Sequence, residues 1–199
     1  MQKRLLPLAI IIIANIVVFE VNAQVGKVGI NTTTPLAMLH VQDSSVLFAG
    51  PSNLAGSFGL TPVSGAGIRM MWYPDKAAFR TGRVSGTHWN RENIGIYSFA
   101  TGFDTKASGQ YAFAAGYVTT ASGTFSTALG ENTIASGSYS TALGNSTIAS
   151  GSYSSSIGNG TNAKGSNSAS LGFSTQANGF ASTVIGLYND TIVATQTTI

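Results

Sequence analysis

The chain has 199 residues, of which 43% are hydrophobic, 9% are charged and none is cysteine. The hydrophobic fraction is too high for an intrinsically disordered chain. The missing cysteines exclude disulfides, thiol catalysis and zinc–thiolate sites. The formal net charge is only +3, without the dense clusters of Lys and Arg that nucleic-acid binding requires. A weakly charged chain rich in Gly, Ser, Thr and Ala instead suits a regular β architecture built from small residues.

Residues 1–23 have the layout of a secretory signal peptide. Lys3 and Arg4 precede an apolar run over residues 5–18, and small residues follow before Gln24. We predict cleavage between Ala23 and Gln24. A retained membrane anchor is the alternative, but the run is short for a bilayer core, which takes about 20 residues. No later segment is apolar enough to span a membrane as a helix, so we expect an exported mature chain without a membrane span.

Residues 24–45 are expected to form a lead-in segment with a turn and then a short strand. Residues 28–35 read VGINTTTP, and residues 36–41 read LAMLHV. The segment resembles the VGIGTTxPxxxLHV stretch found near the start of many surface and fibre-like proteins of Bacteroidetes type. His40 lies within it, and no partner for catalysis or metal binding is visible nearby, so we interpret His40 as structural.

Residues 46–94 differ in composition from the rest and are interpreted as an irregular β cap. Within it, residues 68–73, 74–76 and 77–84 are expected to form a strand, a turn and a second strand. Solenoid proteins need such caps, because their ends expose an open core and unpaired strand edges. The cap holds both tryptophans, Trp72 and Trp89, which we expect to be lids over the first coil rather than ligand platforms. It also holds a cluster of cations. A competing hypothesis makes three of them an anion or glycan contact: Arg80, Arg83 and Arg91.

Glycine returns every seven residues from Gly95 to Gly186, and every second interval repeats more closely. The repeating unit therefore has 14 residues, as residues 123–136 (GTFSTALGENTIAS) and 137–150 (GSYSTALGNSTIAS) show. A fixed period of this kind indicates a repeat architecture. We predict about seven coils over residues 95–192, each with two short strands. Glycine tolerates positive φ, so we expect glycines at the coil corners, among them Gly109, Gly116, Gly123, Gly130, Gly137, Gly144, Gly151 and Gly158.

We number the slots of the unit from 1 to 14, starting at Gly95. Both halves of the unit follow the rule Gly-x-x-Ser/Thr-x-Ala-x, so slots 4, 6, 11 and 13 hold small residues. Side chains alternate across a strand, and these four slots are expected to fill the thin interior. Slot 7 is larger and more apolar, and it should lie on an outer face. Slot 3 holds Tyr or Phe in the first five coils and is expected to share that face.

An apolar stripe along one outer face of a secreted rod marks an interface. We predict association around a symmetry axis through Leu129, Leu143, Ile157, Leu171, Ile185, Tyr139 and Tyr153. The alternative is a self-sufficient monomer in which slot 7 points inward. Burial of the slot-7 side chains in a single chain discriminates between the two.

The repeat resembles the head domain of YadA-like trimeric autotransporter adhesins, whose motif is similar to SVAIGxxSxAxG. The motif stands here as Ser126-Thr-Ala-Leu-Gly130 with Thr133-Ile-Ala135-Ser-Gly137, and it recurs one coil later. The resemblance implies a left-handed parallel β-roll, three chains packed side by side, and attachment at the cell surface or outer membrane. The stalk and barrel that follow such heads are not recognised. We therefore interpret residues 193–199 as a truncated extension, of a fragment or of a chain with a further domain.

The favoured function is a non-catalytic adhesin-like head that binds an extracellular protein or glycan as a homotrimer, with no cofactor and no metal. The carboxylates of the repeat (Asp104, Glu131 and Asp190) fall in different coils, and both histidines fall outside it, so no acid–base pair or metal cluster is suggested. A structural fibre or spacer segment without ligand binding is the alternative. An ice-binding solenoid is a further one, and it requires the slot-11 threonines Thr133, Thr147 and Thr161 to face solvent.

Overall fold

The computed structural model describes residues 22–24, 27–32, 34, 36–43, 45–51, 54 and 58–190. The body of the predicted signal peptide and the expected extension 193–199 lie outside the described residues. The chain divides into two units, Met1–Phe48 and Ala49–Ile199, and each is described by itself. No helix in the described ranges is long and apolar enough to cross a membrane.

The first unit holds a small three-stranded sheet formed by β1 (Asn22–Gln24), β2 (Lys27–Ile30) and β3 (Leu39–Val41). Strand β1 pairs antiparallel with β2, and β2 pairs parallel with β3. The short strand expected over residues 36–41 is therefore present as β3. The backbone N–H of Leu36 donates to Nδ1 of His40 at 3.3 Å, so this histidine of β3 binds the segment that precedes the strand.

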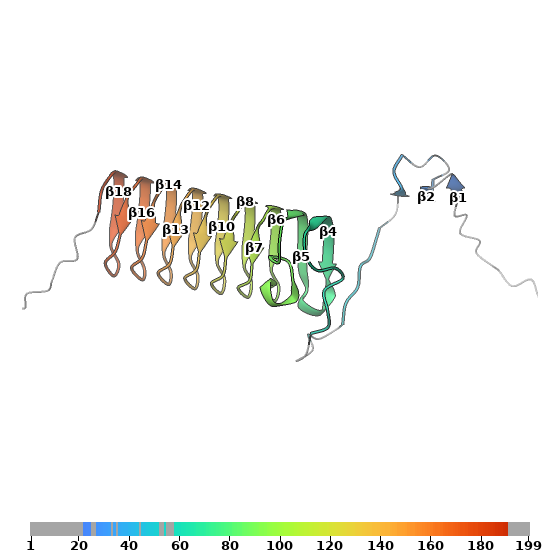
Figure 1. The fold of residues 1–199 in the computed structure, drawn as a ribbon, viewed down its shortest axis with the longest axis horizontal. Helices are drawn as coiled ribbons and strands as arrows, with labels where there is room; N and C mark the ends of the chain where they lie inside the picture. The colour runs from blue at the N-terminus through green and yellow to red at the C-terminus, as the bar shows by residue number, and fades with distance from the viewer. Residues whose placement is uncertain are drawn as a thin grey trace, which may run out of the picture. The chain divides into compact units, whose positions relative to one another are not determined.

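The second unit is a parallel β-solenoid in which each coil has one long and one short strand (Figure 1). Each long strand before the last, β18, pairs with the strand 14 residues further on, as Leu129 does with Leu143. The long strands are β6 (Phe99–Phe103), β8 (Phe113–Tyr117), β10 (Thr127–Glu131), β12 (Thr141–Asn145), β14 (Ser155–Asn159), β16 (Ala169–Phe173) and β18 (Thr183–Leu187). The short strands are β7 (Lys106–Ala107), β9 (Thr120–Ala121), β11 (Ile134–Ala135), β13 (Ile148–Ala149), β15 (Asn162–Ala163) and β17 (Gln176–Ala177).

This architecture confirms the predicted all-β solenoid with a 14-residue period and gives about six complete turns. The seventh coil contributes its long strand β18 and an isolated parallel bridge between Gln176 and Asp190. The count of about seven coils is thus reached only if this last, incomplete coil is included.

The strand, turn and strand expected within the cap are present, and the hairpin that they form extends the long-strand sheet. It consists of β4 (Gly67–Tyr73), the short 3-10 helix η1 (Pro74–Lys76), β5 (Ala78–Val84) and the short 3-10 helix η2 (Arg91–Asn93). Strand β5 pairs parallel with β6, and β4 pairs antiparallel with β5. The result is a nine-stranded sheet that runs from β4 at one end of the solenoid to β18 at the other (Figure 1).

The interior of the solenoid is filled by small side chains, as predicted from the agreement of the two half-coils. Slots 11 and 13 are fully buried in the first six coils, from Thr105 and Ala107 to Thr175 and Ala177. Slot 6 is buried as alanine in the first four coils and then as Ser156, Ser170 and Val184. The serine of slot 4 has a structural reason: the hydroxyl of Ser126 donates to the carbonyl oxygen of Gly123 at 2.6 Å and so closes the turn.

The cap has a core of its own, made of Met71, Tyr73, Ala78, Val84, Trp89 and Ile94, with Phe58 packed against it. Trp89 is completely buried, and its indole N–H donates to the carbonyl oxygen of Thr105 at 2.8 Å. It covers the first coil as predicted. Trp72 does not, because β4 alternates and turns Trp72 to the opposite face from Met71 and Tyr73, where it is half-buried.

Candidate interaction surface

Two of the parallel rows of side chains on the outer face of the nine-stranded sheet matter here, and we name them by their slots. The slot-7 row contains Met70, Thr81, Thr101, Ala115, Leu129, Leu143, Ile157, Leu171 and Ile185. The slot-5 row contains Trp72, Phe79, Phe99, Phe113, Thr127, Thr141, Ser155, Ala169 and Thr183. Neither row contains a charged residue.

The five predicted slot-7 interface residues are all half-buried or exposed in the single chain. Leu129, Ile157 and Leu171 are half-buried, whereas Leu143 is 40% and Ile185 is 65% exposed. The inward orientation required by a self-sufficient monomer is therefore wrong, because alanine, serine and valine of slot 6 occupy the interior instead. Burying a Leu or Ile side chain of this kind is worth about 1.5–3 kcal/mol.

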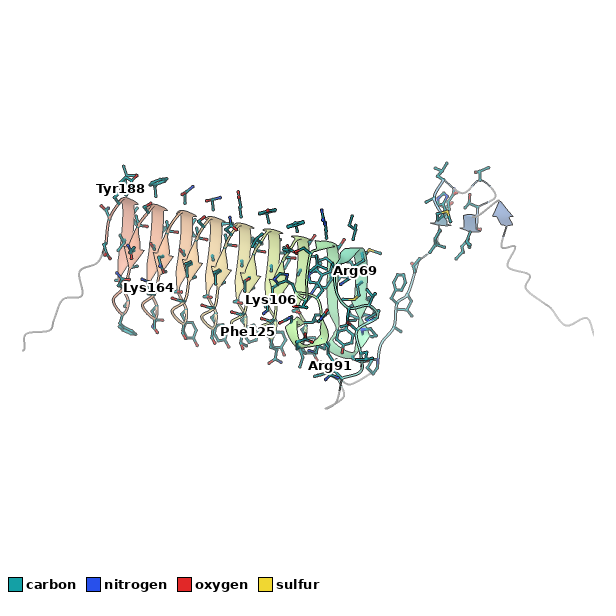
Figure 2. The ribbon with its side chains drawn as sticks, viewed as in Figure 1. Arg69, Arg91, Lys106, Phe125, Lys164 and Tyr188 are labelled. Carbon is teal, nitrogen blue, oxygen red and sulfur yellow. The ribbon has the colours of Figure 1, made fainter. Side chains whose placement is uncertain are left out.

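The slot-3 aromatics form a separate row along one long edge of the solenoid. Figure 2 shows Phe125 at this edge and Tyr188 at the opposite one. Neighbouring rings stack with centroids 4.4 to 5.1 Å apart. The row comprises Tyr97, Tyr111, Phe125, Tyr139 and Tyr153, which are 42% to 59% exposed. Tyr139 and Tyr153 thus border the outer sheet face instead of lying on it with Leu143.

Each slot-3 aromatic has a left-handed backbone, with φ between 56° and 59°. Such a conformation costs an L-residue with a bulky side chain about 1–2 kcal/mol, and Asn is better suited to it. Asn167 does occupy the equivalent position in the sixth coil, at φ 58°. Ring stacking on the adjacent coils offsets part of this strain.

The predicted corner glycines fall into two structural classes. Those of slot 1, Gly109, Gly123, Gly137 and Gly151, open the turns before the long strands, as Ser126 N–H to Gly123 O at 3.2 Å illustrates. Those of slot 8, Gly116, Gly130, Gly144 and Gly158, lie inside the long strands with φ of 120° to 129°, so the expected corner position is wrong for them.

Close contact between coils explains both classes better than turn geometry does. A Cβ added to Gly123 would overlap the carbonyl oxygen of Gly137, and one added to Gly130 would overlap that of Gly144. The corner after each long strand is made two residues later by slot 10, for example Asn132 with φ 53°.

The cations of the cap are mostly engaged in structure, which overturns the hypothesis of a three-arginine anion site. Arg80 is fully buried and donates to the carbonyl oxygens of Ser98 at 2.9 Å and Ala107 at 2.9 Å. It occupies the interior slot that alanine fills in the next coil. Arg83 lies over the ring of Phe103, and Arg91 donates to the carbonyl oxygen of Phe58 at 3.0 Å.

Burial lowers the pKa of Arg80 to about 10, so the guanidinium remains charged at neutral pH. Lys76 is also buried, and its ammonium donates to the carbonyl oxygens of Arg91 at 2.7 Å and Ile94 at 2.6 Å. Burial, together with nearby Arg91 and Arg80, lowers the pKa of Lys76. Arg80 therefore joins the cap to the first coil, whereas Lys76 joins η1 to η2 and Ile94 within the cap.

Asp104 links the end of β5 to the first coil. Its carboxylate accepts hydrogen bonds from the backbone N–H and the hydroxyl of Ser85, both at 2.5 Å, and lies 3.7 Å from Nδ1 of His88. Burial raises the pKa of Asp104, but the two Ser85 hydrogen bonds and the charges of His88 and Arg83 outweigh it, and the net pKa is lowered. The contacts of Asp104 with Ser85 and His88 are therefore structural, and they join the cap to the first coil.

The slot-11 threonines are turned into the solenoid, which removes the basis of the ice-binding hypothesis. Thr133, Thr147 and Thr161 are 0% exposed, and Thr161 pairs its hydroxyl with that of Ser156 at 2.8 Å. A threonine ladder in this position cannot order external water. Within the described part of the chain, no group of three or more His, Asp or Glu side chains is placed to hold a metal ion.

These features define a parallel β-solenoid with two-stranded coils of 14 residues. A family model for the YadA head domain repeat matches residues 94–119, 121–147 and 149–175. Residues 94–175 are therefore a YadA-like head repeat region. Head domains of this family are parts of trimeric, adhesin-type surface proteins and are not enzymes. No curated protein matches the chain.

Proposed function

We propose that the chain is the exported, non-catalytic head of a cell-surface adhesin, and that three copies pack side by side through the slot-7 row. The observation that carries the proposal is the row of half-buried and exposed Leu and Ile side chains from Leu129 to Ile185, which lies beside the uncharged slot-5 row. The YadA-like repeats support the number three and the adhesive role.

Attachment is proposed to use the surfaces that self-association leaves open. These include the outer face of the short strands, where Lys106, Ile134 and Lys164 project, and the bound ligand is an extracellular protein or glycan. Display at the cell surface requires export, which we propose to proceed through cleavage between Ala23 and Gln24.

The oligomer is tested with a matched pair of substitutions in the mature chain that begins at Gln24. Leu143 on the slot-7 row is 40% exposed, and Ile134 on the short-strand face is 39% exposed. We expect light scattering to give a trimer mass for the wild type and for Ile134→Asp, and a monomer mass for Leu143→Asp. A monomeric wild type, or equal behaviour of the two variants, contradicts the proposal.

The adhesive role is tested separately, with the oligomer screened for binding to immobilised extracellular matrix proteins and glycans. We expect saturable binding of the wild-type oligomer to at least one of them. An oligomer that binds none of these ligands contradicts the adhesin proposal and favours a spacer segment that holds another domain away from the envelope.

A further inference from the structure

The cap hairpin continues the outer sheet face beyond the repeat. Strand β4 turns Ile68, Met70 and Trp72 to one side, and Met70 is 71% exposed. Met70 pairs with Thr81, and Trp72 pairs with Phe79. Through β5 and β6 these pairs align with the slot-7 and slot-5 rows of the coils, so both rows pass from the repeat into the cap without a break.

The bulky side chains change rows along this face. In β5, β6 and β8 the slot-5 row is aromatic and slot 7 is small, as with Phe113 beside Ala115. From β10 onward slot 7 is large and slot 5 is small, as with Leu129 beside Thr127. Strand β5 and every long strand from β6 to β18 therefore present one large and one small apolar or hydroxyl side chain. The large side chains form a ridge, which passes from the slot-5 row to the slot-7 row between β8 and β10.

The aromatic side chains of the slot-5 row stack on one another and are partly exposed to solvent. Phe79 and Phe99 stack with ring centroids 5.5 Å apart, and Phe99 and Phe113 with centroids 5.1 Å apart. Phe113 is 37% exposed. These spacings are close to the distance between neighbouring strands, about 4.8 Å, so the natural complement of the ridge is an uncharged row of side chains on another sheet.

We propose that the outer face of the cap hairpin belongs to the self-association surface. The occupant is a second copy of this chain, aligned parallel, with the aromatic ridge of Trp72, Phe79, Phe99 and Phe113 contacting the same ridge of its neighbour. Parallel alignment around an axis along the solenoid brings each strand level opposite its own equivalent, and the aromatic ridge replaces the Leu/Ile ridge as the contact row where slot 7 is small. The proposal rests on the proposed oligomer and extends it to residues outside the repeat.

A matched pair in the cap provides the first test in the mature chain. Met70 lies on the sheet face and is 71% exposed, whereas Leu60 lies in the preceding loop and is 84% exposed. We expect Met70→Asp to weaken self-association at least tenfold in analytical ultracentrifugation and Leu60→Asp to leave it within twofold of wild type. Circular dichroism of both variants checks that the β structure is retained.

Disulfide capture provides a second readout that does not depend on destabilising the contact. The chain has no cysteine, so Met70→Cys introduces a single thiol. We expect mild oxidation to link two copies through Cys at this position, and Leu60→Cys to remain unlinked. If Leu143→Asp dissociates the oligomer but neither Met70 variant differs from its Leu60 control, the cap inference is wrong while the proposed oligomer stands. If the wild type is monomeric, both are wrong.

Discussion

At the scale of single residues, Arg80 shows how the solenoid is closed at its cap end. The first four coils fill this interior slot with alanine, but among the residues that the structure describes β5 has no short strand beside it. The guanidinium fills that space and donates to Phe79, Ser98 and Ala107. At this end of the solenoid, a single buried arginine therefore fills the space that a short strand fills in the first six coils.

Arg80→Ala is expected to lower the free energy of unfolding by about 3 kcal/mol or more, because it removes charge-assisted hydrogen bonds and leaves a cavity. Arg83→Ala is the control, since Arg83 is exposed and its contact with Phe103 is worth about 0.5–1 kcal/mol. Urea unfolding followed by circular dichroism measures both. Equal losses for the two variants would show that Arg80 does not close the core.

Asp104 predicts an acid-sensitive contribution to stability. Its pKa in the folded chain is lower than the ordinary value of 3.8, so its stabilising effect is present above that value and is lost as pH falls through the folded pKa. Asp104→Asn should cost about 1 kcal/mol at pH 7, and the difference from wild type should shrink below pH 3.8. Thermal unfolding of both proteins across pH 3–7 measures this difference in stability. A difference independent of pH would contradict a stabilising role of the Asp104 carboxylate.

At the scale of elements, the glycine columns set how closely the coils stack. Gly130→Ala places a Cβ against the backbone of Gly144 and forces alanine to φ near 124°. Backbone strain and overpacking each cost about 1–3 kcal/mol, so we expect a loss of at least about 3 kcal/mol in chemical denaturation. Gly86→Ala is the control, because open space surrounds that position. A Gly130→Ala variant as stable as this control would refute the stacking argument.

The repeat could be predicted from the sequence because its period and its small slots appear in both half-coils. The role of the slot-8 glycines could not, since close packing between coils and a corner at positive φ both require glycine and look alike in a sequence. The pairing of β5 with the first coil does have a counterpart in the sequence, because Phe79-Arg-Thr-Gly82 resembles Phe99-Ala-Thr-Gly102 and pairs with it in register. The buried state of Arg80 and Lys76 depends on carbonyl groups brought together by the fold, which no sequence pattern displays.

At the scale of the whole molecule, stability should be the sum of coils and of contacts between neighbouring coils. Deleting residues 137–150 removes one whole unit and joins Ser136 to Gly151, which repeats the existing junction of Ser150 with Gly151. We expect this variant to fold cooperatively, with a smaller denaturant m-value. Deleting residues 137–143 should abolish folding, because a long strand would then have to pair with a short one. Circular dichroism and resistance to chymotrypsin compare the two deletions, and a folded half-unit variant would contradict the two-strand coil.

The register of the nine-stranded sheet also bears on how such a chain changes over generations. One end is closed by Trp89, Arg80 and the β4–β5 hairpin, while each coil presents to the next the same glycine columns and interior slots. Recombination between repeats that gains or loses one unit therefore leaves every remaining contact intact and alters only length, by about 4.8 Å for each coil. The length of the solenoid can therefore change through duplication or loss of a 14-residue unit, without any new sequence motif.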